Sequence, residues 1–444
     1  MNNNDNVQNL ITNKLNLIKR NILASECTPP LYFRGIVTDK QSPPVPIFDN
    51  IIKNYQKIKH VCQIIENNIL IDNTTKPKFV KPENWWPVGL LNYIFDSSYI
   101  DISPLLQLNQ RQKLSLVFVA QEYFNLSNES VDRILNRTNS LFNEVYQERK
   151  PNEKLYFEIK PGVYYMLKRH TVIKFLTDGD LFFNFLIETA FGLDINNYPH
   201  YNNFQSFVGV KAYCPEGLCV EIDFAGITLY DVVHFREQQP LDKKPYYAVR
   251  MLRGYDTSKR LATDVIKATK QKLLDNLPFF IIELVNIITQ ISHHGLVNPD
   301  IKLDNIVVDI ITGQPKMIDF QLILPEGEQS PIDNPSDMYV EETLKTSHHV
   351  AIEYIKGKSC DKSTMTFSLC QLIYDILIIL KANNTNNNSI NNLLKNSELL
   401  SFIKLGISNN VKVRPNPVYT MAQIIGATHS FDHQHLEKMF RSNS

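Results

Sequence analysis

The sequence predicts an α+β fold, in which short β-type runs gather in one part of the chain and helices form the rest. Three runs rich in β-branched and aromatic residues follow one another at Tyr156–Ile159, Val163–Leu167 and Thr171–Phe175, with turn residues between them. Two later apolar stretches, Leu277–Ile291 and Leu369–Leu380, read as buried helices. We therefore expect a small β-rich part followed by a larger helical part.

Composition and charge narrow the class of protein. The chain has 444 residues, of which 43% are hydrophobic, enough for two or three domains with a sizeable core. Its 46 basic and 46 acidic residues cancel, so we expect no nucleic-acid partner and no anionic membrane surface. The apolar stretches are shorter than the about 20 residues that span a bilayer, and no run of signal-peptide length opens the chain. Six scattered cysteines indicate reduced thiols, so we expect a soluble, cytoplasmic protein without a membrane span.

Residues 1–150 carry no recognised motif and are expected to form a helical N-terminal extension of unknown role. Ile51–Ile69 and Ser130–Tyr146 have the apolar periodicity of amphipathic helices. The segment 42–46 fits an ordinary loop better than a polyproline ligand. Trp85-Trp86 fits packing against a neighbouring domain better than a partner-binding patch.

A stretch after the first buried helix concentrates polar groups that suit phosphate chemistry. The octapeptide 298–305 (NPDIKLDN) places Asp300, Lys302 and Asn305 in one loop. Two β-type runs around a glycine turn follow, and a hairpin there would return Asp319 to the side of that loop. Two carboxylates, an amide and an ammonium can hold a divalent metal with phosphate oxygens while a carboxylate accepts a hydroxyl proton.

This stretch resembles the eukaryotic-type protein kinases. The octapeptide follows their catalytic loop, H-R-D-[LI]-K-x-x-N, and residues 319–321 (DFQ) follow their metal-binding D-F-G motif. The departures are Asn298 for histidine, Pro299 for arginine and Gln321 for glycine. The resemblance implies a bilobal protein-kinase-like fold over residues 152–430. Its small β-rich lobe would span about 152–230 and its large helical lobe about 231–430.

The same resemblance implies a phosphate-binding site in the small lobe. The turn at Gly162 has a single glycine where the family's G-x-G-x-x-G loop has three. Residues 171–174 (TVIK) resemble the V-A-I-K strand, which makes Lys174 the candidate ligand of the α- and β-phosphates. Glu188, in the amphipathic run Leu181–Phe191, would hold that lysine by an ion pair.

Residues 223–229 (DFAGITL), after the apolar strand Leu218–Ile222, resemble the hinge segment of the family, E-Y-A-G-G-T-L in many members. In that segment the backbone hydrogen-bonds the adenine edge. Asp223 and Ala225 are therefore candidate nucleotide contacts, and Ile222 stands at the gatekeeper position.

The large lobe carries further family features in order. Residues 351–353 (AIE) match the A-P-E motif, and Arg414 matches the arginine that pairs with its glutamate. Residues 234–276 are expected to form an insertion, and residues 382–392, rich in asparagine, a solvated loop. Residues 325–347 correspond to the activation segment and are expected to be mobile.

Other departures concern support and regulation of the site. Met365 replaces the central-helix aspartate that serves the catalytic-loop histidine, here Asn298, and we expect repacking to compensate. Gly192 and Asn298 occupy positions of the stacked apolar spine that includes Phe320, so we expect a differently supported spine. Pro299 removes the usual receiver of an activation-segment phosphate. We therefore expect constitutive activity, or control by the N-terminal extension or a regulatory partner bound there.

The resemblance implies phosphorylation of serine and threonine hydroxyls on a protein substrate, with ATP and Mg²⁺. Asp300 would accept the hydroxyl proton and Lys302 would neutralise the γ-phosphate. Asn305 and Asp319 would bind Mg²⁺.

Two alternatives to this activity remain open. A catalytically weak pseudokinase would use the fold as a nucleotide- or partner-binding scaffold, which the single glycine at 162 and Gln321 favour. A small-molecule kinase is not expected to carry Lys302, residues 351–353 and Arg414 together. The divergent, asparagine-rich sequence suits a viral or secreted bacterial effector, which would act in the host cytoplasm.

Overall fold

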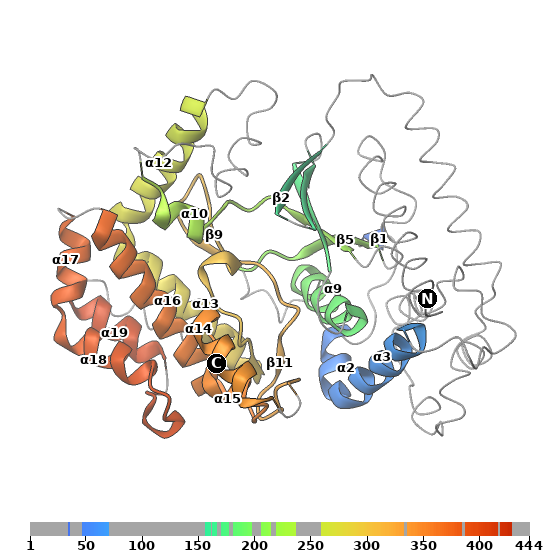
Figure 1. Cartoon of the computed structure of the whole chain (residues 1–444). Helices are drawn as coiled ribbons and strands as arrows, with labels where there is room; N and C mark the ends of the chain where they lie inside the picture. Colours follow the sequence, from blue (N-terminus) through green and yellow to red (C-terminus); the bar gives the residue numbers. More distant parts are fainter. Residues whose placement is uncertain are drawn as a thin grey trace, which may run out of the picture. The chain divides into compact units, whose positions relative to one another are not determined.

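The structure, a computed structural model, describes residues 34–35, 47–70, 156–160, 162–166, 170–176, 181–197, 206–214, 219–236, 259–332, 335–383, 387–415 and 418–428. The chain divides into two compact units (Figure 1). Unit 1 comprises Met1–Tyr201 and Gly209–Phe224, and unit 2 comprises Asn202–Val208 and Ala225–Ser444. Helices are combined with small antiparallel sheets, as expected of the predicted α+β class.

Unit 1 contains a six-stranded sheet with the order β1-β5-β6-β4-β3-β2, and its neighbouring strands are antiparallel. Its strands are β1 (Arg34–Gly35), β2 (Tyr156–Lys160), β3 (Val163–Met166), β4 (Thr171–Phe175), β5 (Val210–Cys214) and β6 (Cys219–Asp223). The three predicted β-type runs are β2, β3 and β4. The predicted strand 218–222 lies one residue later, as β6, whose residues 219–222 are buried between neighbours on both sides.

The run Leu181–Phe191 was predicted to be amphipathic, but it lies in α9 (Leu181–Asn197), whose residues 183–194 are all buried with no exposed face. Such a helix must be covered on more than one side. It packs on β5 and also against α2 (Ile47–Lys53) and α3 (Tyr55–Leu70), which lie along it in Figure 1. Unit 1 therefore includes part of the predicted N-terminal extension as a covering layer for α9.

The prediction of a single helix over Ile51–Ile69 is wrong, because the structure has two helices there. Asn54 separates them: its N–H donates to the carbonyl of Ile51, and its carbonyl accepts from Ile58 N at 3.0 Å. Asparagine favours helix ends over helix interiors, which explains the break. The predicted helix at Ser130–Tyr146, the segment 42–46 and Trp85-Trp86 lie outside the described residues.

Unit 2 is mainly helical, with α13 and α16 in contact at its centre. α13 also packs against α19, and α16 against α10 and α18. The helices are α10 (Leu229–His234), α12 (Lys259–Asp275), α13 (Leu277–His293), α14 (Asp337–Thr346), α15 (Ile352–Ile355), α16 (Lys362–Asn383), α17 (Asn388–Lys395), α18 (Ser397–Gly406) and α19 (Tyr419–Thr428).

The length predicted for α16 was too short. The helix has 22 residues and, by length and composition alone, could cross a membrane, as could the bent pair Asp264–Asp275 with Leu277–His293. However, 72% of the most apolar window of α16 is buried inside the protein. A helix in a protein core needs the same apolar composition as a membrane-spanning helix. The burial of α16 identifies it as a core helix.

Helices are found in three segments for which no helix was predicted. α12 lies within the predicted insertion 234–276, and α14 within the segment 325–347 that was predicted to be mobile. In the asparagine-rich stretch 382–392, α16 continues to Asn383 and α17 begins at Asn388. Asn387 caps α17 by accepting from Ile390 N at 3.0 Å. Asparagine here marks a helix boundary, which composition alone does not reveal.

Two small sheets bring the predicted site residues together in unit 2. One has the order β10-β9-β7 and the other β11-β8. Their strands are β7 (Ile227–Thr228), β8 (Leu296–Val297), β9 (Ile306–Val308), β10 (Pro315–Met317) and β11 (Leu324–Pro325). The β9–β10 pair confirms the predicted hairpin, and Gly313 in its turn has φ 76°, which glycine adopts without strain.

Candidate active site

The loop after β8 is held by its own asparagine and by α16. The Asn298 Oδ1 oxygen accepts the N–H of Asp300 at 3.0 Å, which fixes the turn at the candidate base. Ser368 Oγ, on α16, lies 3.4 Å from the carbonyl oxygen of Pro299 and from that of Thr364. Met365 is fully buried on the same helix. Met365 stands where the family resemblance implied an aspartate. The expected compensation is incomplete, because Asn298 Nδ2 is buried without a hydrogen-bond partner among the described residues.

Asp300 receives three different side-chain donors. Lys302 Nζ lies 2.8 Å from each of its carboxylate oxygens. Asn305 Nδ2 donates to Oδ2 at 2.8 Å and to the Asp300 carbonyl at 2.9 Å. His349 Nε2 lies 3.1 Å from Oδ1. The structure therefore brings together the predicted Asp300, Lys302 and Asn305, and adds His349.

The donors keep Asp300 ionised. Burial raises the pKa of this carboxyl group, but the hydrogen bond from His349 and the charge and hydrogen bond of Lys302 lower it by more. The pKa of Asp300 therefore lies below its usual range. An ionised carboxylate is an acceptor only, as a base for a hydroxyl proton must be.

The hairpin leads Asp319 back toward Asn305. Met317 pairs with Ile306, and Ile318 N donates to the Asn305 carbonyl at 2.9 Å, so Asp319 follows directly. Asp319 has φ 74°, a left-handed conformation that residues other than glycine rarely adopt and that is concentrated at functional sites. The next residue, Phe320, is buried and its ring packs on Phe207 with centroids 5.9 Å apart.

Asn305 and Asp319 are suitable ligands for Mg²⁺. The Asn305 side chain commits its nitrogen to Asp300 as a donor, which leaves its Oδ1 oxygen as the group that can face a cation. Amide and carboxylate oxygens are hard ligands of the kind that magnesium prefers. The donor set fits the metal that the resemblance implies.

The predicted ion pair of unit 1 is present. Lys174 Nζ, on β4, lies 3.5 Å from the Glu188 carboxylate on α9, and Glu188 is only 2% exposed. Gly162, in the β2–β3 turn, has φ 79°, and its carbonyl accepts from Phe175 N at 2.8 Å. This left-handed conformation is one that glycine adopts without strain.

Gly192 has a packing reason. A β-carbon at this position of α9 would lie 2.4 Å from Val210 Cγ2 and 2.8 Å from the Val210 backbone nitrogen on β5. The helix approaches the sheet too closely for a larger side chain there. The close contact between α9 and β5 therefore requires glycine at position 192.

In the segment 223–229, the Asp223 side chain is 69% exposed and bonds Lys211 at 2.9 Å. Phe224 N donates to the His170 carbonyl at 3.3 Å. In unit 2, a β-carbon on Gly226 would lie 2.2 Å from the Val308 carbonyl oxygen, which requires glycine. Ala225 precedes this glycine at the start of unit 2.

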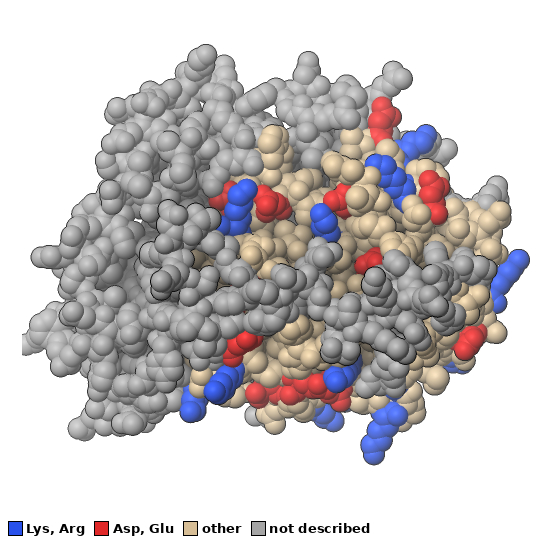
Figure 2. All heavy atoms as spheres, turned by 180° about the vertical axis from the view of Figure 1, so that it is seen from behind, with Lys and Arg blue, Asp and Glu red and all other residues tan. Residues whose placement is uncertain are grey.

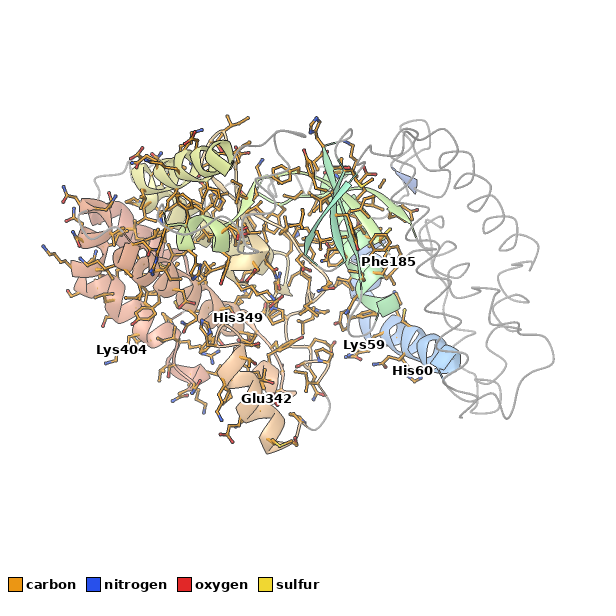
Figure 3. The ribbon with its side chains drawn as sticks, turned by 45° about the horizontal axis from the view of Figure 1, so that its top comes forward. Lys59, His60, Phe185, Glu342, His349 and Lys404 are labelled. Atoms are coloured by element: carbon orange, nitrogen blue, oxygen red, sulfur yellow. The ribbon has the colours of Figure 1, made fainter. Side chains whose placement is uncertain are left out.

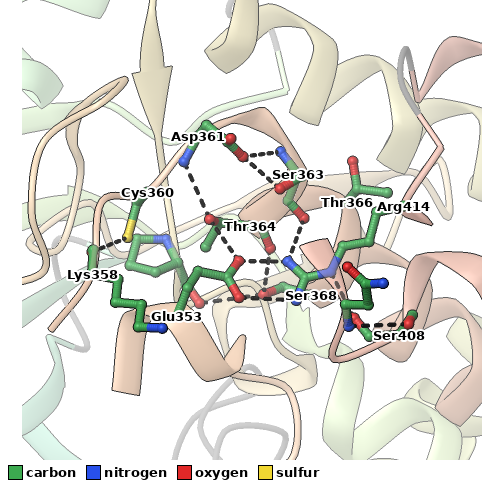
Figure 4. A network of polar contacts seen from close by, with 12 residues as sticks. Glu353, Lys358, Cys360, Asp361, Ser363, Thr364, Thr366, Ser368, Ser408 and Arg414 are labelled. Carbon is green, nitrogen blue, oxygen red and sulfur yellow. Dashed lines mark hydrogen bonds and ion pairs between the residues drawn. The ribbon is translucent and has the colours of Figure 1, made fainter. Parts of the chain in front are cut away.

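Glu353 and Arg414 form the predicted buried pair (Figure 4). Arg414 Nη2 lies 2.9 Å from Glu353 Oε2, and Thr364 Oγ1 donates to Oε1 at 2.9 Å. The guanidinium also donates to the carbonyls of Ser363 and Ser408. Such a pair is costly to break on one side, because it leaves a buried charge without its partner. This network holds the chain in place on the C-terminal side of His349.

Sequence reasoning missed His349, because no motif in the resemblance requires a histidine there. The only signal was its place, two residues before the 351–353 motif that closes the activation segment.

A comparison of the sequence with models of protein families finds no matching family, and a comparison with curated proteins finds no matching protein. On the face drawn in Figure 2, basic and acidic side chains are interspersed without a broad basic patch among the described residues.

Proposed function

We propose that the chain is a protein kinase with a bilobal kinase-like fold, which transfers the γ-phosphoryl group of ATP to serine or threonine hydroxyls of a protein substrate. The observation that carries the proposal is the ionised Asp300 carboxylate, bonded by Lys302 and Asn305, at the start of a hairpin that ends at Asp319. Phosphoryl transfer needs a base, here Asp300, and a cation that can reach the phosphoryl group, here Lys302. It also needs oxygen ligands for a metal, here Asn305 and Asp319.

Asp300 accepts the proton as the substrate O–H bond breaks. The hydroxyl oxygen bonds to the γ-phosphorus, and the bond from that phosphorus to the bridging oxygen of ADP breaks. Lys302, which is 32% exposed, can turn from Asp300 to the transferred phosphoryl group and neutralise its charge. Asn305 and Asp319 would hold Mg²⁺, which would supply charge neutralisation at the phosphate oxygens.

Lys174 binds the α- and β-phosphates in this proposal, and Glu188 orients it. A buried glutamate 3.5 Å away limits the positions of the ammonium group, so the charge is directed before the nucleotide arrives.

The tight turn at Gly162 is one observation that favours a second candidate, a pseudokinase scaffold, because it offers less bare backbone to phosphates than a three-glycine loop.

The experiment is a phosphoryl-transfer assay with γ-labelled ATP, Mg²⁺ and generic protein substrates. Wild-type protein should label substrate, and Asp319→Ala should reduce the rate at least tenfold, about 1.4 kcal/mol in the barrier. Asp264→Ala, at an exposed position of α12, is the matched control and should retain the wild-type rate. Nucleotide binding without any transfer by the wild type would instead support the pseudokinase.

A further inference from the structure

We propose that His349 is a positioning residue of the phosphoryl-transfer site: its imidazole holds the Asp300 carboxylate in the orientation that receives the substrate proton. This inference rests on the proposed function. His349 lies beyond the C-terminal end of α14, between that helix and residues 351–353 (Figure 3). It therefore joins the activation segment directly to the proposed base.

The contact between His349 and Asp300 is short and sheltered. Nε2 lies 3.1 Å from Oδ1, and the two side chains are 15% and 13% exposed. Both carboxylate oxygens already accept from Lys302 at 2.8 Å, so Asp300 acts as an acceptor and Nε2 is the donor of this pair. Water competes weakly for a contact at this exposure, so the bond can fix the carboxylate's rotation.

The number of acceptor positions explains why a third donor is useful. A carboxylate offers about four lone-pair positions, two on each oxygen. Lys302 uses one on each oxygen, Asn305 uses one on Oδ2 and His349 one on Oδ1. When Lys302 turns to the phosphoryl group, one position on each oxygen becomes available to the substrate hydroxyl. Asn305 and His349 then still hold one oxygen each, which prevents the carboxylate from rotating.

The backbone on both sides of His349 is anchored. On the N-terminal side, Val350 N donates to the Ser347 carbonyl at 2.9 Å and closes the turn that contains His349. Ala351 is fully buried at the start of α15, whose Glu353 belongs to the Arg414 network. His349 is therefore delivered to Asp300 by fixed neighbours on both sides.

The neighbouring histidine provides the matched control. His348 is 61% exposed and contacts Asp375 instead of Asp300. His349→Ala should lower kcat about tenfold to a hundredfold, the size expected when a reacting group is misplaced, with the KM for ATP unchanged. His349→Gln, which retains a donor at similar reach, should recover most of the loss. His348→Ala should behave as the wild type.

A double-mutant cycle tests the contact without relying on activity. The unfolding free energies of the wild type, His349→Ala, Asp300→Ala and the double variant should give a favourable coupling between the two sites. Zero coupling would overturn the inference. The inference would also be overturned if His349→Ala had a kcat equal to or above that of the wild type, or if His349→Gln did not recover the kcat lost in His349→Ala. Each of these results would leave the proposed function intact. Absence of transfer by the wild type itself would instead defeat the proposed function, and the positioning role with it.

Discussion

Asp231, in the first turn of α10, shows how burial changes the chemistry of a single residue in unit 2. It is 7% exposed, and burial raises its pKa to about 7, helped by the nearby charge of Asp304 and opposed by the hydrogen bond with Thr228. No motif in the sequence distinguishes this aspartate from the other acidic residues. Its protonation state is set by neighbours that only the fold brings together.

The raised pKa of Asp231 predicts a pH-dependent stability. In the unfolded chain its pKa is near 3.8, so between about pH 4 and 7 the folded protein binds more protons than the unfolded one. The contribution of Asp231 to the unfolding free energy therefore falls as pH rises through that window and levels off above it. Asp231→Asn removes this titration and should be more stable than the wild type by about 2–4 kcal/mol at pH 8.

Urea unfolding at pH 4.5 and pH 8 measures this difference. The gap between Asp231→Asn and the wild type should widen toward pH 8. Asp275→Asn, an exposed position at the end of α12, should shift neither curve. Parallel pH profiles for Asp231→Asn and the wild type would show that the aspartate titrates normally in the folded protein.

His349 illustrates which site residues sequence alone can and cannot supply. Asp300, Lys302 and Asn305 were predicted because they lie within eight residues of one another, and local turns bring such groups together. His349 reaches Asp300 from 49 residues further along the chain. That contact depends on the path of α14, on the turn between Ser347 and Val350 and on the anchor at Glu353, none of which leaves a local pattern.

At the level of elements, strands and long apolar helices were predicted well and helix boundaries poorly. β4 and α13 have strong local signals, and their positions agree with the prediction to within two residues. α12 and α14 are rich in polar residues, and no helix was predicted at either place. Their helical state depends on one face packing against the rest of unit 2, because isolated helices of this length are marginal in water.

The packing of α2 against α9 gives the prediction at this scale. Phe48 is 1% exposed, its ring meets Phe191 edge-on with centroids 4.8 Å apart, and its N–H donates to the buried Asp194 at 2.6 Å. Phe48→Ala should destabilise unit 1 by about 3–5 kcal/mol, since it removes a buried ring and leaves a cavity. Hydrogen exchange of the α9 amides should accelerate accordingly.

Asp49 is the matched control for Phe48, because it lies on the exposed side of the same helix. Asp49→Ala should change stability by less than about 0.5 kcal/mol. Equal exchange rates for α9 in Phe48→Ala and in the wild type would mean that α2 is a dispensable appendage. Faster exchange only in Phe48→Ala would show that residues 47–70 are part of the structure that supports Glu188.

At the scale of the whole molecule, the sequence indicated the α+β class and the order of the motifs along the chain. The structure divides the chain after Phe224, within the segment that resembles a hinge, and assigns residues 202–208 to unit 2. That assignment arises because Phe207 and Val208 pair with Met317, a contact between segments more than 100 residues apart. Long-range pairings of this kind have no local sequence signal.

The most direct test of the proposed kinase activity compares wild-type protein with Asp300→Asn. Asparagine keeps the shape of the side chain but cannot accept the hydroxyl proton. With γ-labelled ATP and Mg²⁺, the variant should transfer phosphate at least about a hundredfold more slowly. Its affinity for nucleotide, measured by calorimetry, should be nearly unchanged, since the carboxylate contacts the substrate hydroxyl. Undiminished transfer by Asp300→Asn would contradict the assignment of Asp300 as the base and the mechanism built on it.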